Sequence, residues 1–313
     1  MKRISLSVLC LLAFVLMFTK VNAKAPAANP IEGRWDITVT DGERTYPSWL
    51  EVKHSGLSTL VGRFVGGGGS ARPISKVNFT DGKLSFSIPP QWESESNDLV
   101  VEGTLQGDSL VGTMVVPNGK THTWVGHRAP LLTRTKEPVW GKPIKLFNGK
   151  DLTGWHAQRG ENQWKAENGI LVSPKPGANL VTDQTFTDFK LHIEFRYPKE
   201  SNSGVYLRGR YEVQITDSKG EEPADGLLGG IYGFIAPNEM LAKDPGEWNS
   251  YDITLVGRIV TLTVNGKEVI CKQVIPGITG GALDSNEGAP GPIYLQGDHG
   301  TIEYRNIVLT PAK

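Results

Sequence analysis

Cysteine is almost absent from this 313-residue chain, which contains only Cys10 and Cys271. Cys10 lies within an apolar N-terminal run that is expected to be removed. Cys271 would then be the only remaining cysteine, which excludes an internal disulfide, a cysteine metal site and a thiol pair. The fold must therefore depend on hydrophobic cores, and a chain of this length can form two of them.

A net charge of either sign is also lacking, because 33 Lys and Arg residues balance 33 Asp and Glu residues. Removal of a leader that contains Lys2, Arg3 and Lys20 leaves the rest of the chain slightly acidic. Such a balance gives no support to binding of nucleic acid or of an anionic membrane. We expect neither as a partner.

Long hydrophobic runs are missing outside the N-terminus. There, Lys2 and Arg3 precede the apolar run Ile4–Phe18, and small residues follow up to Ala23. This arrangement is typical of a signal peptide over residues 1–23, because the run is short for a membrane span; an uncleaved anchor is the alternative. We expect an exported protein, periplasmic or secreted, that is free of the membrane after cleavage.

A sustained helical period is absent, whereas turn pairs such as Asp41-Gly42 and Asn118-Gly119 are frequent. The pattern predicts an all-β chain whose residues 28–128 form a small antiparallel barrel or sandwich. The segments with strand composition are Arg34–Thr40, Trp49–Lys53, Thr59–Val65, Lys83–Ile88, Leu99–Leu105, Ser109–Val115 and Thr121–Gly126. A proline-rich, basic linker is predicted over residues 129–143.

Residues 144–313 are predicted to form a second strand-rich domain. The expected strands are Leu191–Tyr197, Gly204–Arg208, Tyr211–Thr216, Tyr251–Val256, Ile259–Val264, Lys267–Cys271, Ile293–Gln296 and Ile302–Leu309. Long loops rich in Gly and Pro interrupt them at Lys219–Gly246 and Pro276–Pro292. Loops of this length in a compact domain usually serve function.

The segment Gly204–Ser218 carries the most informative pattern. Tyr206, Arg208, Glu212 and Gln214 alternate with apolar residues. Alternate side chains of a strand share a face, so these four are predicted to lie on one face, opposite the core. A face with an acid, a cation, an amide and an aromatic ring suits a hydroxylated ligand such as a sugar.

A second polar set follows in the last part of the chain, where Tyr294 and Gln296 lead to Asp298 and His299. An Asp-His pair can act as an oriented base, in which the carboxylate fixes the imidazole tautomer. A surface turn is the alternative interpretation.

Other polar and aromatic residues have simpler interpretations. His192, Glu194 and Arg196 alternate with apolar residues and are assigned to an ordinary solvated face. The tryptophans of the first domain are assigned to its core: Trp35, Trp49, Trp92 and Trp124.

Acidic residues near the long loop raise the possibility of a metal. They are Asp217, Glu221, Glu222 and Asp225. Their oxygens suit Ca²⁺, but their spacing matches no calcium-loop consensus, and a solvated acidic loop is preferred. The metal assignment stays open, and no cofactor is required.

Several motifs of the second domain resemble a known family. They are Lys145–Trp155 (KLFNGKDLTGW), Asn202–Arg208 (NSGVYLR), Tyr211–Ile215 (YEVQI), Gly246–Asn249 (GEWN), Gly291–Gln296 (GPIYLQ) and Glu303–Ile307 (EYRNI). From about Ile144 to Leu309 they resemble, in order, the 3-keto-disaccharide hydrolase family, formerly a domain of unknown function. The resemblance does not extend to Ile31–Arg128.

This resemblance implies a jelly-roll β-sandwich, similar to the concanavalin A-like lectins and glucanases, with the ligand on its concave face. It also implies a 3-keto-disaccharide or 3-keto-glucoside as substrate. A ketone at C3 acidifies the C2–H bond, so a base can start elimination of the C1 substituent, and water then adds to the enone.

The candidate roles follow from that chemistry. Glu212 or the Asp298–His299 pair is the base, and Arg208 polarises the keto oxygen. Gln214 and Gln296 orient hydroxyl groups. The aromatic residues that supply stacking surface are Tyr206, Tyr232, Trp248 and Tyr294, although Trp248 has an alternative role in sealing the sandwich.

Ordinary glycoside cleavage is a weaker hypothesis. The glucanases with this sandwich fold have the motif Glu-x-Asp-x-x-Glu on one strand. The corresponding segment of this chain begins at Glu212 but has Gln214 at the central position and Asp217 at the last one. The double-displacement pair of carboxylates is thus incomplete. Two non-enzymatic alternatives remain: a lectin-like carbohydrate-binding protein and an assembly module with an exposed apolar patch.

Overall fold

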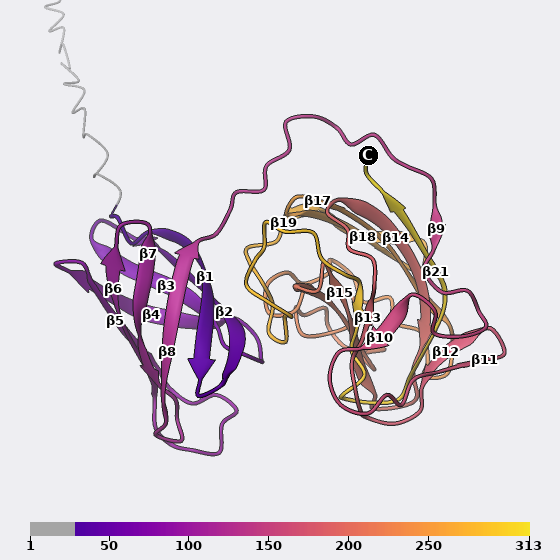
Figure 1. Ribbon diagram of the computed structural model, residues 1–313, viewed down its shortest axis with the longest axis horizontal. Coiled ribbons are helices and arrows are strands. Elements are labelled where there is room, and N and C mark those ends of the chain that lie inside the picture. The colour runs from indigo at the N-terminus through magenta and orange to yellow at the C-terminus, as the bar shows by residue number, and fades with distance from the viewer. Residues whose placement is uncertain (1–28) are drawn as a thin grey trace, which may run out of the picture. The chain divides into compact units, whose positions relative to one another are not determined.

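The computed structural model describes residues 29–313, and every regular element in this part of the chain is a β-strand (Figure 1). The predicted fold class, an antiparallel barrel followed by a jelly-roll β-sandwich, is confirmed. The predicted signal peptide lies outside the described residues. Among residues 29–313, none forms a helix with the length and hydrophobicity needed to cross a bilayer.

The first strands close into an antiparallel barrel in which each strand pairs with its neighbours in sequence and the first pairs with the last. They are β1 (Gly33–Asp41), β2 (Arg44–Ser55), β3 (Thr59–Val65), β4 (Arg72–Thr80), β5 (Lys83–Ile88), β6 (Leu99–Gln106), β7 (Ser109–Val115) and β8 (Thr121–Arg128). Alternate residues point inward, as in β8, where His122, Trp124 and Gly126 are buried.

Strand β4 was missed in the sequence because its alternation is broken. Leu60 pairs with Val77 and Gly62 with Ile74, so β4 has one extra residue between these pairs. This bulge puts Ser75 and Lys76 next to one another on the exposed side. Pro73 further weakens the strand pattern.

Three of the four tryptophans are buried, but only Trp35 and Trp124 lie in the barrel core. Trp49 belongs instead to the hydrophobic cluster of the sandwich, where its ring packs edge-on against Phe234. Trp92 is 53% exposed, so its assignment to the core was wrong. It lies after β5, in a segment without strand structure, where the guanidinium of Arg72 stacks 5.0 Å from its ring centre. Charge stacking and packing against a glycine loop, described below, replace core burial at this position.

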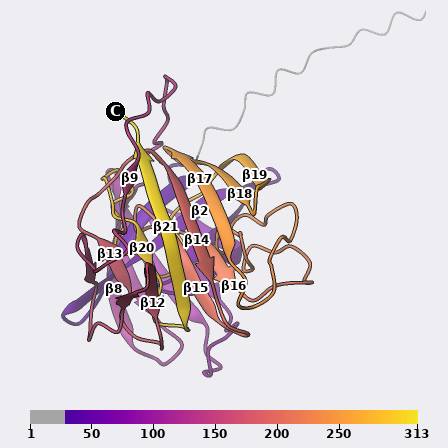
Figure 2. The same ribbon diagram turned by 90° about the vertical axis from the view of Figure 1, so that its right-hand side faces the viewer.

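The second region contains two antiparallel sheets. The five-stranded inner sheet has the order β10 (Trp155–Ala157), β13 (Leu180–Thr182), β20 (Tyr294–Leu295), β15 (Asn202–Leu207) and β16 (Tyr211–Thr216). The outer sheet, seen face-on in Figure 2, has the order β11 (Lys165–Glu167), β12 (Ile170–Ser173), β21 (Ile302–Pro311), β14 (Phe189–Arg196), β17 (Asn249–Val256), β18 (Ile259–Val264) and β19 (Lys267–Val274). The short strand β9 (Ile144–Lys145) pairs with β21.

One hydrophobic cluster joins the two sheets. Leu191 and Ile193 of the outer sheet and Val205 and Val213 of the inner sheet all belong to it, and each is at most 1% exposed. Because these residues alternate with polar ones, the opposite face of the inner sheet is left to the polar side chains. This face carries the site described below.

The outer sheet faces solvent with paired charges, as predicted for His192, Glu194 and Arg196. The His192 ring hydrogen-bonds Asp252, Glu194 pairs with Arg305 at 2.5 Å, and Arg196 pairs with Glu303. These pairs join neighbouring strands.

Residues 129–143 have no strand longer than one bridge, and they lie against the sandwich. Arg134 binds Asp188 through two hydrogen bonds of 2.6 and 3.1 Å, and Trp140 bridges to Ala312. Ile31–Lys313 forms one compact unit, and Cys271, on β19, is exposed with a free thiol.

Candidate active site

A cavity of about 250 Å³ opens on the polar face of the inner sheet. Its sandwich lining is Asn202, Tyr206, Glu212, Gln214, Tyr232, Gly280, Gly281, Tyr294, Gln296, Asp298 and His299, and the barrel adds Gly67, Gly68 and Gly69. The structure thus brings together eight of the ten residues predicted for the site.

Strand β16 places Glu212 and Gln214 in this cavity, because Tyr211, Val213 and Ile215 alternate with them and point into the core. Glu212 is only 3% exposed. Glu212 pairs with Tyr206 on β15, and its carboxylate lies beside Gly204, where an added Cβ would be 2.3 Å from Oε1. The absence of a side chain at Gly204 therefore makes room for the carboxylate.

The carboxyl group of Glu212 has a pKa far above that of an ordinary glutamate. Burial raises its pKa to about 8, against the opposing effect of the hydrogen bond that it receives from the Tyr206 hydroxyl at 2.9 Å. The Tyr206 ring stacks on Tyr294, with ring centres 4.2 Å apart. A group with a pKa close to the working pH is well suited to proton transfer.

Asp298 and His299 form a second proton-transfer unit. Nδ1 of His299 lies 2.6 Å from Oδ1 of Asp298, so its Nε2 remains available to a ligand. The hydrogen bond to Asp298 raises the pKa of His299. Burial alone would raise the pKa of Asp298, but the hydrogen bond and charge of His299 lower it overall. Asn179 donates to Asp298 at 3.3 Å and to the Tyr294 hydroxyl at 2.8 Å, which orients both.

Two buried acceptor oxygens in the cavity have no hydrogen-bond partner: Oδ1 of Asn202 and Oε1 of Gln296. A buried polar atom without a partner costs free energy unless a ligand or water satisfies it. Oxygens of this kind accept hydrogen bonds from hydroxyl groups. Together with the Gln214 amide and the Tyr232 hydroxyl, they suit a polyhydroxylated ring.

Arg208 does not reach this cavity, so the prediction that it shares a face with Glu212 was wrong. Strand β15 ends at Leu207, and Arg208 has a left-handed backbone with φ of 53°. This turn breaks the alternation and buries the side chain completely. Its guanidinium donates to the Tyr211 hydroxyl and to the carbonyl of Gly257, each at 2.9 Å.

Trp248 also lies elsewhere, and its predicted role as a stacking surface is contradicted. The guanidinium groups of Arg196 and Arg305 lie 4.8 and 3.9 Å from its ring centre. Trp248 therefore covers the charged face of the outer sheet. It directly precedes β17, and the strand direction sends its ring to the solvent side.

Sequence reasoning missed Asn202, Gly280, Gly281 and the three barrel glycines as parts of the cavity. Asn202 stands two residues before Gly204 and four before Tyr206, so strand alternation could have revealed it. The glycines carry no such signal, since only the packing of distant segments brings them here.

A second cavity, of about 360 Å³, adjoins the first and shares Gly67, Gly281, Tyr294 and Asp298 with it. Its remaining lining consists of Thr45, Tyr46, Pro47, Gln158, Arg159, Gly177, Ala178, Asn179, Ala282 and Leu283. Asp298 is therefore placed at the boundary between the two cavities.

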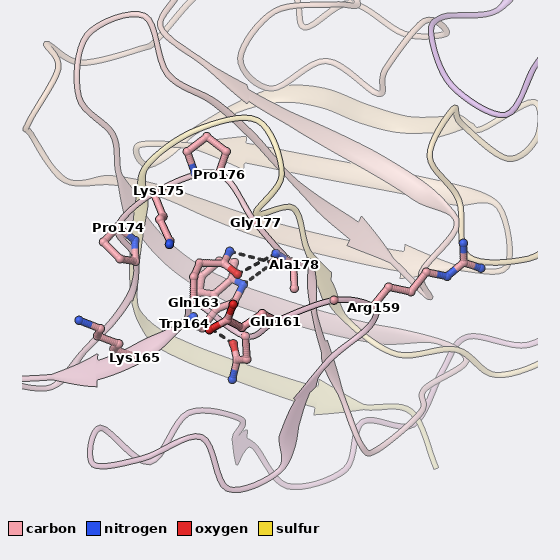
Figure 3. A pocket seen from close by; sticks show the side chains of 12 residues that line it. Arg159, Glu161, Gln163, Trp164, Lys165, Pro174, Lys175, Pro176, Gly177 and Ala178 are labelled. Carbon is pink, nitrogen blue, oxygen red and sulfur yellow. Dashed lines mark hydrogen bonds between the residues drawn. The ribbon is translucent and has the colours of Figure 1, made fainter.

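A third hollow, of about 790 Å³, lies beside residues 159–165 and 174–178 (Figure 3). It shares Arg159, Gly177 and Ala178 with the second cavity and no residue with the first. Gln163 instead fixes the loop that precedes Asn179: its amide nitrogen donates to Ala178 and its oxygen accepts from the Ala178 N–H. Trp164 also donates to Ala178 at 2.7 Å. Gln163 and Trp164, which line this hollow, therefore hold the backbone next to Asn179 in place.

No cluster of three or more His, Cys, Asp or Glu side chains suited to a metal ion occurs within residues 29–313. The acidic residues considered for calcium do not form one: Asp217, Glu221, Glu222 and Asp225.

Comparison with known proteins agrees with the motifs of the second region. Residues 142–310 match the family model of the 3-keto-alpha-glucoside-1,2-lyase-like domain. A 3-keto-disaccharide hydrolase of Bacteroides thetaiotaomicron is 25% identical over 166 residues, which is 41% of this chain and 57% of that protein. The chain thus spans little more than half the length of this relative.

Two solved structures resemble parts of the chain. A Parabacteroides distasonis protein named as a candidate glycosyl hydrolase is 29% identical, with a TM-score of 0.47, and covers 58% of this chain and 96% of its own. A non-specific endo-β-1,3(4)-glucanase is 10% identical, with a TM-score of 0.35. The match covers 56% of this chain and 95% of the glucanase chain.

Proposed function

The chain belongs to the 3-keto-α-glucoside-1,2-lyase-like family, and on this basis we propose that it cleaves the glycosidic bond of a 3-keto-glycoside by elimination. The observation that carries the proposal is a buried Glu212, with a pKa of about 8, in one cavity with the Asp298–His299 pair. A carboxyl group and an imidazole with these properties provide a base and an acid as the pH approaches 8.

We assign the base role to Glu212 and the acid role to His299 from their positions. Glu212 lines only the first cavity, which we assign to the keto sugar. Asp298, which holds His299, lines both cavities, so the pair stands where the bond to the leaving group would lie. The Nε2 proton of the imidazolium is therefore available to the departing oxygen.

The reaction then runs in two stages. Glu212 takes the C2 proton, and the electrons of that bond pass through the enolate to expel the C1 oxygen, which receives a proton from His299. Water next adds across the C1–C2 double bond of the enone, with its hydroxyl on C1 and its proton on C2. The product is the free 3-keto sugar.

The enolate oxygen needs hydrogen-bond donors, and Arg208 is not placed to be one. The Tyr232 hydroxyl and the Gln214 amide both line the cavity and take this role in the proposal. The unpartnered oxygens of Asn202 and Gln296 accept from sugar hydroxyls. The Tyr206–Tyr294 stack forms part of the apolar wall.

The test uses 3-keto-trehalose and a 3-keto aryl glucoside, each beside its unoxidised parent, with aglycone release as the measurement. Release from the ketones alone is expected, because only they have an acidic C2–H bond. Release from ketone and parent alike would replace the proposal with ordinary glycoside hydrolysis. Release from none of them would leave a carbohydrate-binding protein. Export by the N-terminal segment belongs to the same proposal.

A further inference from the structure

The second cavity is walled by two separate parts of the chain. The barrel contributes Thr45, Tyr46, Pro47 and Gly67, whereas the sandwich contributes the rest of its lining. The barrel has no counterpart in the matched family region, which begins at residue 142. A ligand group in this cavity would therefore contact residues that the family domain alone does not possess.

The barrel wall is held firmly at this position. The Gly281 N–H donates to the Gly67 carbonyl at 3.2 Å, and the hydroxyls of Thr38 and Ser285 lie 2.6 Å apart. The glycine loop itself is backed by Trp92: Gly69 has φ of 77°, and a Cβ there would lie 2.3 Å from the indole ring. Such a wall is formed before a ligand arrives.

The chemistry of the cavity suits a second sugar. Tyr46 offers an aromatic ring, which packs over Gly67, and its hydroxyl is already engaged 3.0 Å from Nδ1 of His122. Gln158 and Asn179 add amide groups, and Asp298 adds a carboxylate. An aromatic surface surrounded by directional polar groups is the usual arrangement for binding a pyranose.

Arg159 adds the one cationic side chain of this lining. Figure 3 shows its guanidinium directed away from Gln163 and Trp164, and the residue also lines the second cavity. It is exposed, so its five N–H donors remain open to hydroxyl oxygens of a ligand.

We propose that the second cavity binds the departing sugar of the substrate, and that the barrel thereby selects the leaving group through Tyr46, together with Arg159 of the same lining. This inference rests on the proposed function, because it places the scissile bond at Asp298, between the two cavities. It gives the N-terminal barrel a direct part in substrate choice: a disaccharide fills both cavities, whereas a methyl glycoside fills only the first.

The test compares kcat/KM for two ketones, the disaccharide 3-keto-trehalose and the simple glycoside methyl 3-keto-α-glucoside. We expect Tyr46→Ala and Arg159→Gln each to lower the ratio of the two values about tenfold, which corresponds to loss of one good sugar contact. Tyr46→Phe keeps the ring and should hold the wild-type ratio. Arg44→Gln, an exposed arginine on the same strand as Tyr46 but outside the cavity lining, controls for loss of charge.

Binding is measured in parallel in a Glu212→Gln background, where the substrates survive, by titration calorimetry. Weaker binding of the disaccharide alone, after either substitution, supports the inference even if turnover fails. Equal losses for both ligands, or no loss for either, would overturn it. If the wild-type protein cleaves neither ketone, but the substitutions still weaken binding of the disaccharide alone, only the proposed reaction is rejected.

Discussion

The Tyr206 hydroxyl lies 2.9 Å from Oε2 of Glu212, and the Gly280 carbonyl offers the same hydroxyl a second acceptor at 2.9 Å. A phenol has one proton, so Tyr206 donates to only one of them at a time. Protonated Glu212 donates to Tyr206, which then donates to Gly280. Ionised Glu212 instead receives the Tyr206 proton. The charge on Glu212 therefore determines whether the Tyr206 hydroxyl donates its hydrogen bond to Glu212 or to Gly280.

Replacing Glu212 with Gln should lower kcat on a 3-keto-glycoside by at least about 100-fold, because the amide cannot accept the C2 proton. Aglycone release under saturating substrate measures the effect. Glu303→Gln, which removes a carboxylate from the outer sheet, is the matched control and should retain activity. Full activity of the Glu212 variant would remove this residue from the chemistry.

The pH dependence of kcat/KM should report both proton-transfer groups. Activity should rise with pH as Glu212 loses its proton, with a midpoint of about 8, and fall as His299 loses its own. Tyr206→Phe removes a hydrogen bond that favours the ionised carboxylate. The rising limb should therefore move upward by about one pH unit. A rising limb that stays in place after this substitution would show that another group governs it.

Gly204→Ala tests the space beneath the carboxylate. Since the new Cβ would lie 2.3 Å from Oε1 of Glu212, the side chain must move. We expect kcat to fall about tenfold or more, and the free energy of unfolding to fall by about 1–3 kcal/mol. Steady-state kinetics and urea denaturation measure the two effects. Ser203→Ala, at the neighbouring position but on the core side, should affect stability without a comparable change in kcat.

Asp36→Asn should stabilise the protein at neutral and alkaline pH. Burial, and then the charge of Glu287, raise the pKa of Asp36 from 3.8 to about 9. Above pH 3.8 the folded chain thus keeps a proton on Asp36 that the unfolded chain loses. The stability that this protonated carboxyl contributes is fully present below pH 3.8 and is lost as the pH rises through about 9. The amide has no proton to lose.

Denaturation midpoints at pH 5, 7 and 9 should therefore show a growing advantage of the Asp36→Asn variant. Asp98→Asn, at an exposed barrel position, is the control for loss of a negative charge. A difference between the variant and the wild type that does not change with pH would contradict the assignment of a protonated Asp36.

The sequence predicted well wherever strand alternation holds without interruption. Glu212 and Gln214 share the cavity because β16 is regular, and the ends of β3, β5, β7, β16 and β18 agree with the expected ones. Alternation also explains why His192, Glu194 and Arg196 face solvent on the outer sheet.

Prediction failed where a turn or a tertiary contact decides the direction of a side chain. The left-handed residue Arg208 reverses its side chain within one position of a regular strand, and no spacing rule anticipates this. Trp248 packs against arginines of two strands that are far apart in sequence from one another. The barrel glycines reach the cavity only through packing against Gly280 and Gly281.

Cys271 is the only cysteine of the described residues, and it lies on β19, outside the lining of both cavities. A maleimide dye or spin label would consequently attach to this region at a single defined position and report ligand binding without occupying the sugar site. Hydrogen bonding to Glu268, and then its charge, raise the pKa of the thiol, so coupling will proceed faster in mildly alkaline buffer.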